Sequence, residues 1–491
     1  MTSTPASPTE PSAPADPSGE PWAGPPAGRC DVLVVGGGPA GLLLAILLRQ
    51  RGVDVVVLER RRQPSTHSRA IGLHPPALAA LAAVGLDEAA IDRGARIVRG
   101  AARSKDRHLG SLSFERSWPG RPYVLSLPQS VTEELLTRRL AQLAPAALHR
   151  GVDVVSLRDR GEDVQVATQR TPQQTTTRAP RTTTQKTGPG RAPGQNLPDA
   201  RAADAASGGW CARVVVGADG ARSTVRALAG IRTGLRTYLD TYLMGDMRDM
   251  GELADVADPD DARVSRSARS ASSDRSRRSA PADRTTESGR TATIHLHPDG
   301  VVESFPLPGG ERRWVAHTGT ASAPTASPAE PADPDDLAAL VRRRTGTRID
   351  PSTTTMISAF TVQRRSARTL VRGRLVLIGD AAHEISPIGG QGITLGWLDA
   401  LALAPLLEQV VTRDLHHPLT SMPLLQRFDR SRRRATRTAG LLAELNMMLG
   451  RPRSAPVARG RDAVIRAVLS TPLRHPMAWA YSMGWATIRR S

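Results

Sequence analysis

The chain has 491 residues, and its two cysteines, Cys30 and Cys211, exclude a disulfide framework and favour a reducing compartment such as the cytoplasm. Its formal net charge is +19, but aromatic residues are few and no nucleic-acid-binding motif occurs, so we expect no nucleic-acid partner. Glycines and charges interrupt every candidate membrane span before it reaches roughly 18 apolar residues, which predicts a soluble protein.

Three segments have the composition of disordered chain. Residues 1–29 are rich in Pro and Ser, and residues 170–209 and 258–290 have no apolar period. Such segments cannot bury enough apolar surface to offset the entropy cost of ordering them. Each internal segment interrupts a strand pattern that resumes afterwards, so we interpret both as low-complexity insertions in hairpin loops.

The first ordered pattern is the most specific one. Residues 31–35 form a continuous apolar run, typical of a parallel strand that is covered on both faces. Gly36, Gly38 and Gly41 follow, then a helical pattern and a second apolar strand that ends in Glu59. The glycines permit a tight turn, a close approach to a pyrophosphate and close helix–strand packing, and Glu59 can accept from ribose hydroxyls. The pattern predicts a dinucleotide-binding βαβ unit, and the alternative is an ordinary Gly-rich turn.

Two further motifs stand at the ends of apolar strands. Asp219 and Gly220 follow the run at residues 214–217, and Asp380 follows the run at residues 375–378. The second motif leads through a glycine-rich loop into a helix, which directs backbone N–H groups and the positive helix end outward. Such a loop is suited to stabilise negative charge on a bound ligand.

Together these motifs resemble those of the FAD-dependent aromatic hydroxylases of the para-hydroxybenzoate hydroxylase family, over about residues 31 to 410. The resemblance implies an α/β fold with a doubly wound, Rossmann-like FAD-binding domain that is discontinuous in sequence. An inserted antiparallel β-sheet substrate domain and an Arg-rich C-terminal helical region complete it. The ranges expected are 30–91, 124–230 and 362–405 for the FAD-binding domain, 92–123 and 231–361 for the substrate domain, and 406–491 for the C-terminal region.

The resemblance also implies which residues contact FAD. They comprise the glycines of the first turn, the ribose acceptor, an Arg and a Gln near the flavin, the two Asp motifs and the glycine-rich loop. By position they are Gly36, Gly38, Gly41, Glu59, Arg69, Gln129, Asp219, Gly220, Asp380, Pro387, Gly389, Gly390, Gln391, Gly392, Ile393 and Thr394. No metal site is predicted, and we expect His383 to be packed or hydrogen-bonded rather than to act as a base.

Position 394 departs from the resembled family, in which an Asn is typical. The hydroxyl of Thr394 can donate only one hydrogen bond to the flavin, whereas an amide can both donate and accept. One lost neutral hydrogen bond costs roughly 0.5–1.5 kcal/mol. We therefore expect function to survive with weaker flavin retention or a shifted flavin potential.

The expected substrate sheet is less informative. Residues 291–319 read as successive antiparallel strands with turns at 298–300 and 308–310, and residues 236–246 read as another strand. In the resembled family this sheet faces the flavin and holds the phenol. Side chains that could help to deprotonate a phenol, each of which could equally be an ordinary strand residue, are Arg236, Tyr238, Tyr242, His295 and His297. We assign no catalytic residue.

The implied function is that of an FAD-dependent monooxygenase. It would hydroxylate a phenolic or polyketide-like aromatic with O2 through a flavin hydroperoxide, with NADPH or NADH as a transient co-substrate. The alternatives are a flavin-dependent reductase or dehydrogenase acting on an isoprenoid or lipophilic substrate, a flavin halogenase, and a non-enzymatic flavin-dependent docking protein. The glycine-rich loop favours the monooxygenase.

The C-terminal stretch at residues 474–490 mixes Trp, Tyr and Met between basic ends. We expect these side chains to cap the core of the FAD-binding domain. The alternative is a weak interfacial surface that collects a lipophilic substrate, which would give at most weak peripheral membrane contact.

Overall fold

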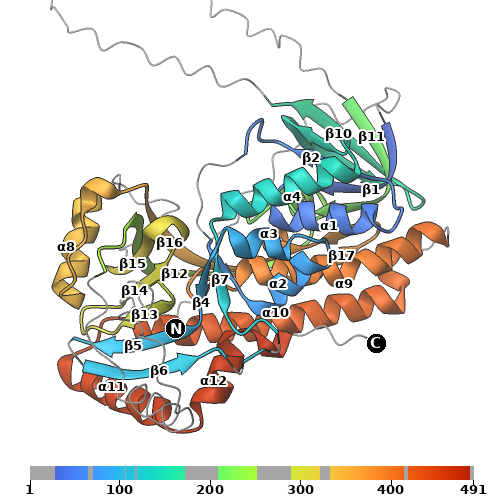
Figure 1. Ribbon diagram of the computed structural model, residues 1–491. Helices are drawn as coiled ribbons and strands as arrows, with labels where there is room; N and C mark the ends of the chain where they lie inside the picture. The colour runs from blue at the N-terminus through green and yellow to red at the C-terminus, as the bar shows by residue number, and fades with distance from the viewer. Residues whose placement is uncertain are drawn as a thin grey trace, which may run out of the picture.

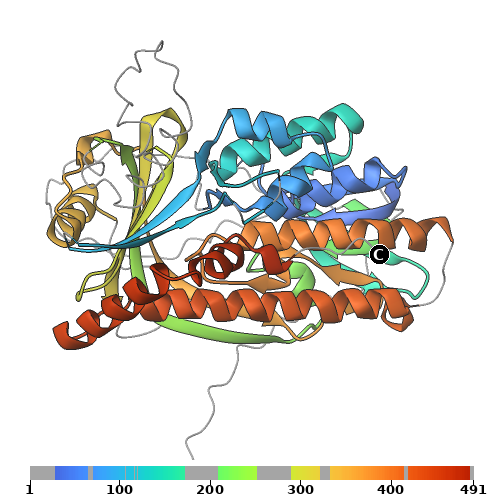
Figure 2. The same cartoon turned by 60° about the horizontal axis from the view of Figure 1, so that its bottom comes forward.

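The computed structural model describes residues 28–64, 70–105, 107–115, 117–118, 120–171, 208–251, 289–320, 332–413 and 418–486. Residues 1–27 of the predicted N-terminal tail, most of both insertions and Arg69 lie outside these residues, whereas the last two residues of that tail belong to β1. Two eight-stranded sheets form the two halves of the molecule, and the long helix α10 (Pro423–Gly450) runs along both of them (Figures 1 and 2).

The first sheet has the strand order β17-β18-β11-β1-β2-β8, and β10 and β9 continue from β11. Neighbours are parallel from β18 to β8, whereas β9, β10 and β17 are antiparallel to their partners. The strands are β1 (Gly28–Val35), β2 (Val55–Glu59), β8 (Leu148–Arg150), β9 (Val152–Asp159), β10 (Val164–Arg170), β11 (Gly208–Gly217), β17 (Val371–Arg372) and β18 (Leu375–Leu377).

Helices cover this sheet and explain its apolar strands. The second half of β1, from Val32 to Val35, and all of β2 are buried, as the continuous apolar runs predicted. Helix α1 packs against α4 and α9, so it is apolar on nearly every side. The helices of this half are α1 (Pro39–Arg49), α2 (Pro75–Ala82), α3 (Asp87–Asp92), α4 (Gln129–Leu143), α5 (Thr224–Leu228) and α9 (Gly392–Thr412). By length and composition α9 could cross a membrane, but here it packs against α1, α2 and α10.

The second sheet has the order β19-β16-β12-β15-β14-β13-β5-β6. It was expected to be antiparallel, and it is so except for β5 and β13, which are parallel. Strand β5 belongs to an earlier chain segment, so no tight turn sets its direction relative to β13. The strands are β5 (Arg99–Ser104), β6 (Arg107–Ser113), β12 (Thr233–Arg248), β13 (Thr291–His295), β14 (Val302–Pro306), β15 (Glu311–Thr320), β16 (Met356–Ala367) and β19 (His383–Glu384).

Smaller elements complete the fold. A three-stranded sheet of β3 (Gly72–Leu73), β7 (Val124–Ser126) and β4 (Ala95–Ile97) lies between the halves (Figure 1). Helix α8 (Pro334–Thr345) packs on one face of the second sheet through a cluster that includes Leu337 and Trp314. Helices α11 (Ala455–Leu469) and α12 (Arg474–Tyr481) pack against β6.

The connections agree only in part with the sequence interpretation. The expected turns at 298–300 and 308–310 join β13 to β14 and β14 to β15. The first insertion joins β10 to β11, which pair directly as a hairpin. The second joins β12 to β13, and the hairpin interpretation is wrong there because β15 and β14 lie between those strands. Strand β16 also crosses the expected domain boundary at residue 362.

Candidate active site

One cavity of about 740 Å³ extends from the carboxyl ends of β1 and β2 to the second sheet. Its walls come from α1 and α4, from the loop between β18 and α9, from strands β12 to β16 and from helices α10 to α12. The carboxyl ends of parallel strands are where open α/β sheets bind their ligands. The cavity therefore connects a nucleotide-type position with the face of a second sheet.

The turn between β1 and α1 depends on three glycines with different constraints. Gly36 has a φ of 110°, and a Cβ there would lie 2.4 Å from the carbonyl oxygen of Ala218. At Gly41 a Cβ would lie 2.0 Å from the carbonyl oxygen of Gly36, so the helix and the turn meet only without a side chain. Gly38 has open space beside it and lines the cavity. The turn thus presents bare backbone and the uncapped N-terminus of α1 to a ligand.

Glu59 stands beside this turn as a fixed acceptor. Its Oε2 accepts a hydrogen bond from the backbone N–H of Gly37 at 2.8 Å, and its Oε1 accepts from the backbone N–H and Nε of Arg61 at 2.8 and 2.9 Å. Burial tends to raise the pKa of Glu59, but the bonds from Arg61 outweigh it and hold the pKa below the usual range. An ionised carboxylate therefore lines this end of the cavity.

Asp219 and Gly220 also line the cavity, but the Asp219 carboxylate is already engaged within the fold. It accepts from the backbone N–H groups of Thr224 and Val225 at 2.7 and 3.1 Å and from the Ser223 hydroxyl. These are the free N–H groups at the start of α5, so Asp219 fixes that helix end.

The loop after β18 is held from behind by a buried group of charges. The Asp399 carboxylate accepts from the Gly379 backbone N–H at 3.0 Å, lies 2.6 Å from Nε2 of His383 and accepts from Nε of Arg432 at 2.6 Å. Burial opposes the charge on His383, but the Asp399 carboxylate outweighs it and raises the pKa of the imidazole. His383 is thus a hydrogen-bonded structural residue, as predicted.

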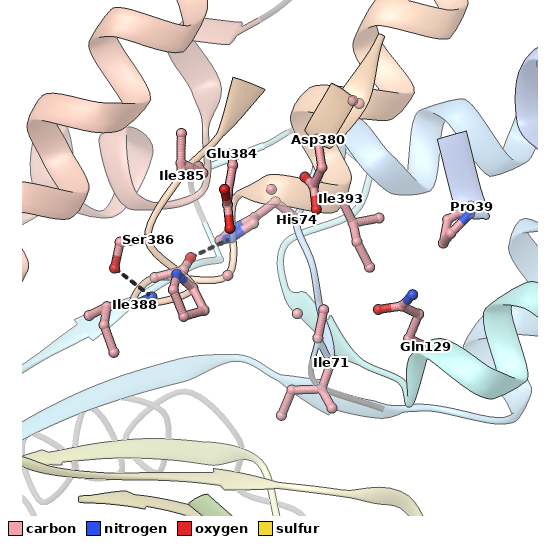
Figure 3. Close-up of a pocket in the computed structure, with 18 of the residues that line it drawn as sticks. Pro39, Ile71, His74, Gln129, Asp380, Glu384, Ile385, Ser386, Ile388 and Ile393 are labelled. Atoms are coloured by element: carbon pink, nitrogen blue, oxygen red, sulfur yellow. Dashed lines mark hydrogen bonds between the residues drawn. The ribbon is translucent and has the colours of Figure 1, made fainter. Parts of the chain in front are cut away.

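In front of this group the Asp380 side chain is open to the cavity (Figure 3). Desolvation by the surrounding protein atoms raises the pKa of the Asp380 carboxyl, and the charge of His383 opposes this rise. No hydrogen bond from a described residue engages this carboxyl, in contrast to Glu59 and Asp219. Asp380 is therefore available to a ligand.

The glycine-rich part of the loop follows along the same wall. Pro387, Gly389, Gly390, Gly392 and Ile393 all line the cavity, and α9 begins at Gly392 without a side-chain cap. The loop thus places the positive end of a long helix at the cavity wall.

His74, which the sequence interpretation did not single out, holds this loop in place. Its Nε2 lies 3.0 Å from the carbonyl oxygen of Gly389 (Figure 3). Burial lowers the pKa of His74 to about 4, so the ring is neutral and Nε2 donates to that oxygen.

The remaining residues expected to contact FAD fall into three groups. Gln129 lines the cavity from the start of α4 and donates to Glu133 at 2.8 Å. Gly41 was expected to contact FAD but does not line the cavity, because it packs against the turn, where a Cβ would lie 2.0 Å from the carbonyl oxygen of Gly36. Gln391 and Thr394 were expected to face the flavin, but both are buried outside the lining, because the first turn of α9 directs Gly392 and Ile393 there instead.

The far end of the cavity is apolar. One register row of the second sheet runs through Met244, Val315, Glu303, Ile294 and Ala102, and every member of the row lines the cavity. Apart from Glu303, this row offers only hydrophobic contact.

Helices α11 and α12 close that end with further apolar side chains and a tyrosine. Tyr481 stacks on Phe114 with ring centroids 5.7 Å apart and meets His74 edge-on at 5.8 Å. The C-terminal stretch therefore forms part of the cavity wall as well as packing on the core. Trp479 remains 46% exposed, so the two aromatic side chains of this helix have different environments.

None of the five candidates for substrate deprotonation lines the cavity. Side chains alternate between the faces of a strand, so Ile294 and Leu296 line the cavity while His295 faces away. Burial lowers the pKa of His295 to about 3, which keeps it neutral. The hydroxyl of Tyr238 donates to Glu444 of α10.

Two of the other three candidates have partners within the fold, whereas the buried hydroxyl of Tyr242 has no hydrogen-bond partner among the described residues. Arg236 pairs with Glu444, and His297 Nδ1 accepts from the backbone N–H of Asp299 at 3.1 Å. Tyr242 is buried and stacks on Phe360. The sequence signals were genuine strand signals, but they did not reveal which face of each strand meets the cavity.

This geometry is typical of a dinucleotide-binding α/β protein, and here the second sheet lines the same cavity. Residues 29–180 and 199–418 match the family model described as FAD binding domain. The chain belongs to this FAD-binding family.

Two curated relatives give the level of similarity. The chain is 31% identical over 379 residues to a rifampicin monooxygenase of Streptomyces venezuelae, with 76% of this chain and 63% of the relative covered. It is 32% identical over 435 residues to a 6-methylpretetramide 4-monooxygenase of Streptomyces rimosus, with 86% and 63% covered. The chain therefore spans less than two thirds of the length of these relatives.

A solved structure supports the fold. The crystal structure of p-nitrophenol 4-monooxygenase from Pseudomonas putida superposes with a TM-score of 0.71 at 22% sequence identity. The alignment covers 94% of this chain and 100% of that one.

Proposed function

We propose that this protein is an FAD-dependent monooxygenase that hydroxylates a phenolic or polyketide-like aromatic with NADPH or NADH and O2. The observation that carries the proposal is the single cavity that joins the bare β1–α1 turn to the apolar face of the second sheet. Both curated relatives are named as monooxygenases, one for rifampicin and one for 6-methylpretetramide.

The cavity residues fit FAD by their donor and acceptor groups. Gly38 and the N-terminus of α1 would face the pyrophosphate, and Glu59 would accept from the ribose. Asp380, which has no partner of its own among the described residues, would accept from the ribityl hydroxyls. The loop from Pro387 to Ile393 would lie against the flavin ring, with the positive end of α9 near its pyrimidine side.

When bound, the flavin would supply the redox chemistry with oxygen, and the protein would position the substrate and exclude water. Phe305 and Phe360 and the row from Met244 to Ile294 would hold the aromatic rings, with Tyr481 closing the cavity. In this proposal residues 231–361 carry most of the substrate-binding sheet. We also infer that NAD(P)H binds transiently, that the enzyme is cytoplasmic, and that it makes at most weak peripheral membrane contact.

The test is NAD(P)H oxidation by the purified, FAD-loaded protein, followed together with oxygen uptake. A panel of phenols and polycyclic aromatic polyketides should include compounds that stimulate both rates and yield a product heavier by one oxygen atom. Equal product formation under strict anaerobiosis would instead assign the protein to the reductases or dehydrogenases. Absence of turnover with every reductant and substrate would contradict the enzymatic proposal.

A further inference from the structure

The apolar end of the cavity contains one carboxyl group that the fold itself does not use. Glu303 lies on β14 and is 8% exposed, and its remaining exposure is to the cavity. No described residue donates a hydrogen bond to it or forms an ion pair with it. Burying a carboxyl group without a partner is unfavourable, because the protein then replaces none of its lost hydration.

The neighbours of Glu303 make this position specific. Its cross-strand neighbours are Ile294 on β13 and Val315 on β15, and the next positions in the same row are Ala102 and Met244. All four side chains are apolar and line the cavity. A ligand lying along this row would therefore meet one carboxyl group between hydrophobic side chains.

Burial alone raises the pKa of Glu303 to about 7. The titratable groups facing it are Tyr242 of β12 and Tyr481 of α12, whose own pKa values are raised by burial and by the Glu303 charge. Neither tyrosine changes its charge near neutral pH. Arg313 of β15, which also lines the cavity, is held by Asp246 in a two-bonded ion pair with distances of 2.6 and 2.7 Å. Among the described groups at this end of the cavity, Glu303 is thus the one whose charge changes near neutral pH.

We propose that Glu303 is a substrate-recognition residue, whose carboxylate accepts a hydrogen bond from a phenolic hydroxyl of the aromatic substrate. The inference rests on the proposed function for the substrate class. Glu303 would make the protein bind an aromatic ring with a hydroxyl group more tightly than the same ring without a hydrogen-bond donor. The hydroxyl keeps its proton in this contact, and the apolar row positions the ring around it.

The experiment compares two probes that differ only in the donor, 2-naphthol and 2-methoxynaphthalene. Their dissociation constants for the FAD-loaded protein are measured by equilibrium dialysis at pH 5.5 and pH 8. At pH 8 the native protein should bind 2-naphthol about tenfold more tightly than the ether, since a hydrogen bond to a charged group contributes that much or more. At pH 5.5 the preference should fall severalfold, because Glu303 is then protonated.

Variants separate recognition from folding. Glu303→Gln keeps the shape but not the charge, so its preference should be small and equal at both pH values. Glu303→Leu should have no preference for the hydroxyl. Glu311→Gln is the matched control, because Glu311 begins β15 in the same sheet but does not line the cavity. It should behave like the native protein, and FAD content and thermal unfolding verify that each variant is folded.

Several outcomes would overturn the proposal. These are equal binding of the two probes by the native protein, a pH-dependent preference that persists in Glu303→Gln, and failure of both probes to bind. Tighter binding of 2-(aminomethyl)naphthalene than of 2-naphthol would overturn the phenol assignment in favour of a cationic ligand. Because dialysis requires no turnover, a protein that shows the preference but oxidises no NAD(P)H would contradict only the proposed function.

Discussion

Replacing Gly38 with Val should separate flavin binding from folding. Gly38 has φ −81° and ψ −178°, which Val adopts without strain, and a Cβ there has no heavy atom within 4 Å. At a helix N-cap the change from Gly should cost the apoprotein less than about 1 kcal/mol. The added methyl groups would fill the space that the pyrophosphate must approach.

The expected loss of affinity follows from the bonds that the valine side chain would prevent. Two backbone N–H bonds to a charged phosphate contribute roughly 1.5–3 kcal/mol each, so losing both should cost at least about 3 kcal/mol. That corresponds to more than a hundredfold rise in the FAD dissociation constant. FAD is titrated into apoprotein by fluorescence quenching, and apoprotein stability is measured by urea unfolding.

Gly41→Ala provides the contrasting variant. Its Cβ would lie 2.0 Å from the carbonyl oxygen of Gly36, so the apoprotein itself should lose roughly 1–3 kcal/mol or more. A Gly38→Val protein that binds FAD with native affinity would refute the placement of the pyrophosphate at this turn. A Gly38→Val apoprotein as unstable as Gly41→Ala would refute the claim that the turn is open there.

Two further predictions concern the scaffold. Asp399→Asn should destabilise the protein by about 3–5 kcal/mol in urea unfolding, because it leaves His383 and Arg432 without their buried carboxylate. The His383 share of that cost should be complete below the unfolded histidine pKa near 6.5 and disappear as pH rises through the raised folded value, whereas the Arg432 share should remain. The second prediction concerns the two insertions. A linker of two to four residues should replace 172–207 with FAD retained, because β10 and β11 pair directly. Replacing 252–288 should need a linker of at least about five residues, because the chain must cross two intervening strands there. If a two-residue linker left FAD binding intact at both sites, this topology would be contradicted.

The dinucleotide end could be predicted from the sequence because its constraints are steric and local. Gly36 has a positive φ and Gly41 packs against the carbonyl oxygen of Gly36, so both needs arise within one βαβ unit. The apolar runs beside them show that both strands are covered. The position of Glu59 follows from the same unit. Each of these signals lies within a few dozen residues and depends on backbone geometry, so one sequence contains the whole pattern.

The substrate end could not be predicted in the same way, because it depends on which strand face meets the cavity. In β13 the alternation places either Ile294 or His295 toward the ligand, and the choice is set by distant elements such as α8 and α12. Glu303 is a single acid in an ordinary strand pattern, and only the register across β13, β14 and β15 shows that its neighbours are apolar. The prediction that Thr394 faces the flavin was wrong for a related reason. The rotation of α9 about its axis decides which residues of its first turn line the cavity, and the sequence does not show that rotation.

The Arg-rich C-terminal region helps to fix the distance between the two ends of the cavity. Near its start, α10 binds the first half through Asp429, whose carboxylate accepts from the backbone N–H of Leu370 at 2.6 Å. About 22 Å further along the helix axis, Glu444 accepts from Arg364 of β16 at 2.8 Å. Directly after the helix, Arg451 forms a two-bonded pair with Asp240 of β12. A helix anchored in both sheets cannot let one half rotate without breaking buried or half-buried ion pairs. We therefore infer that Arg451, together with Arg432, which pairs with Asp399 of α9, helps to hold the two ends of the cavity at a fixed distance.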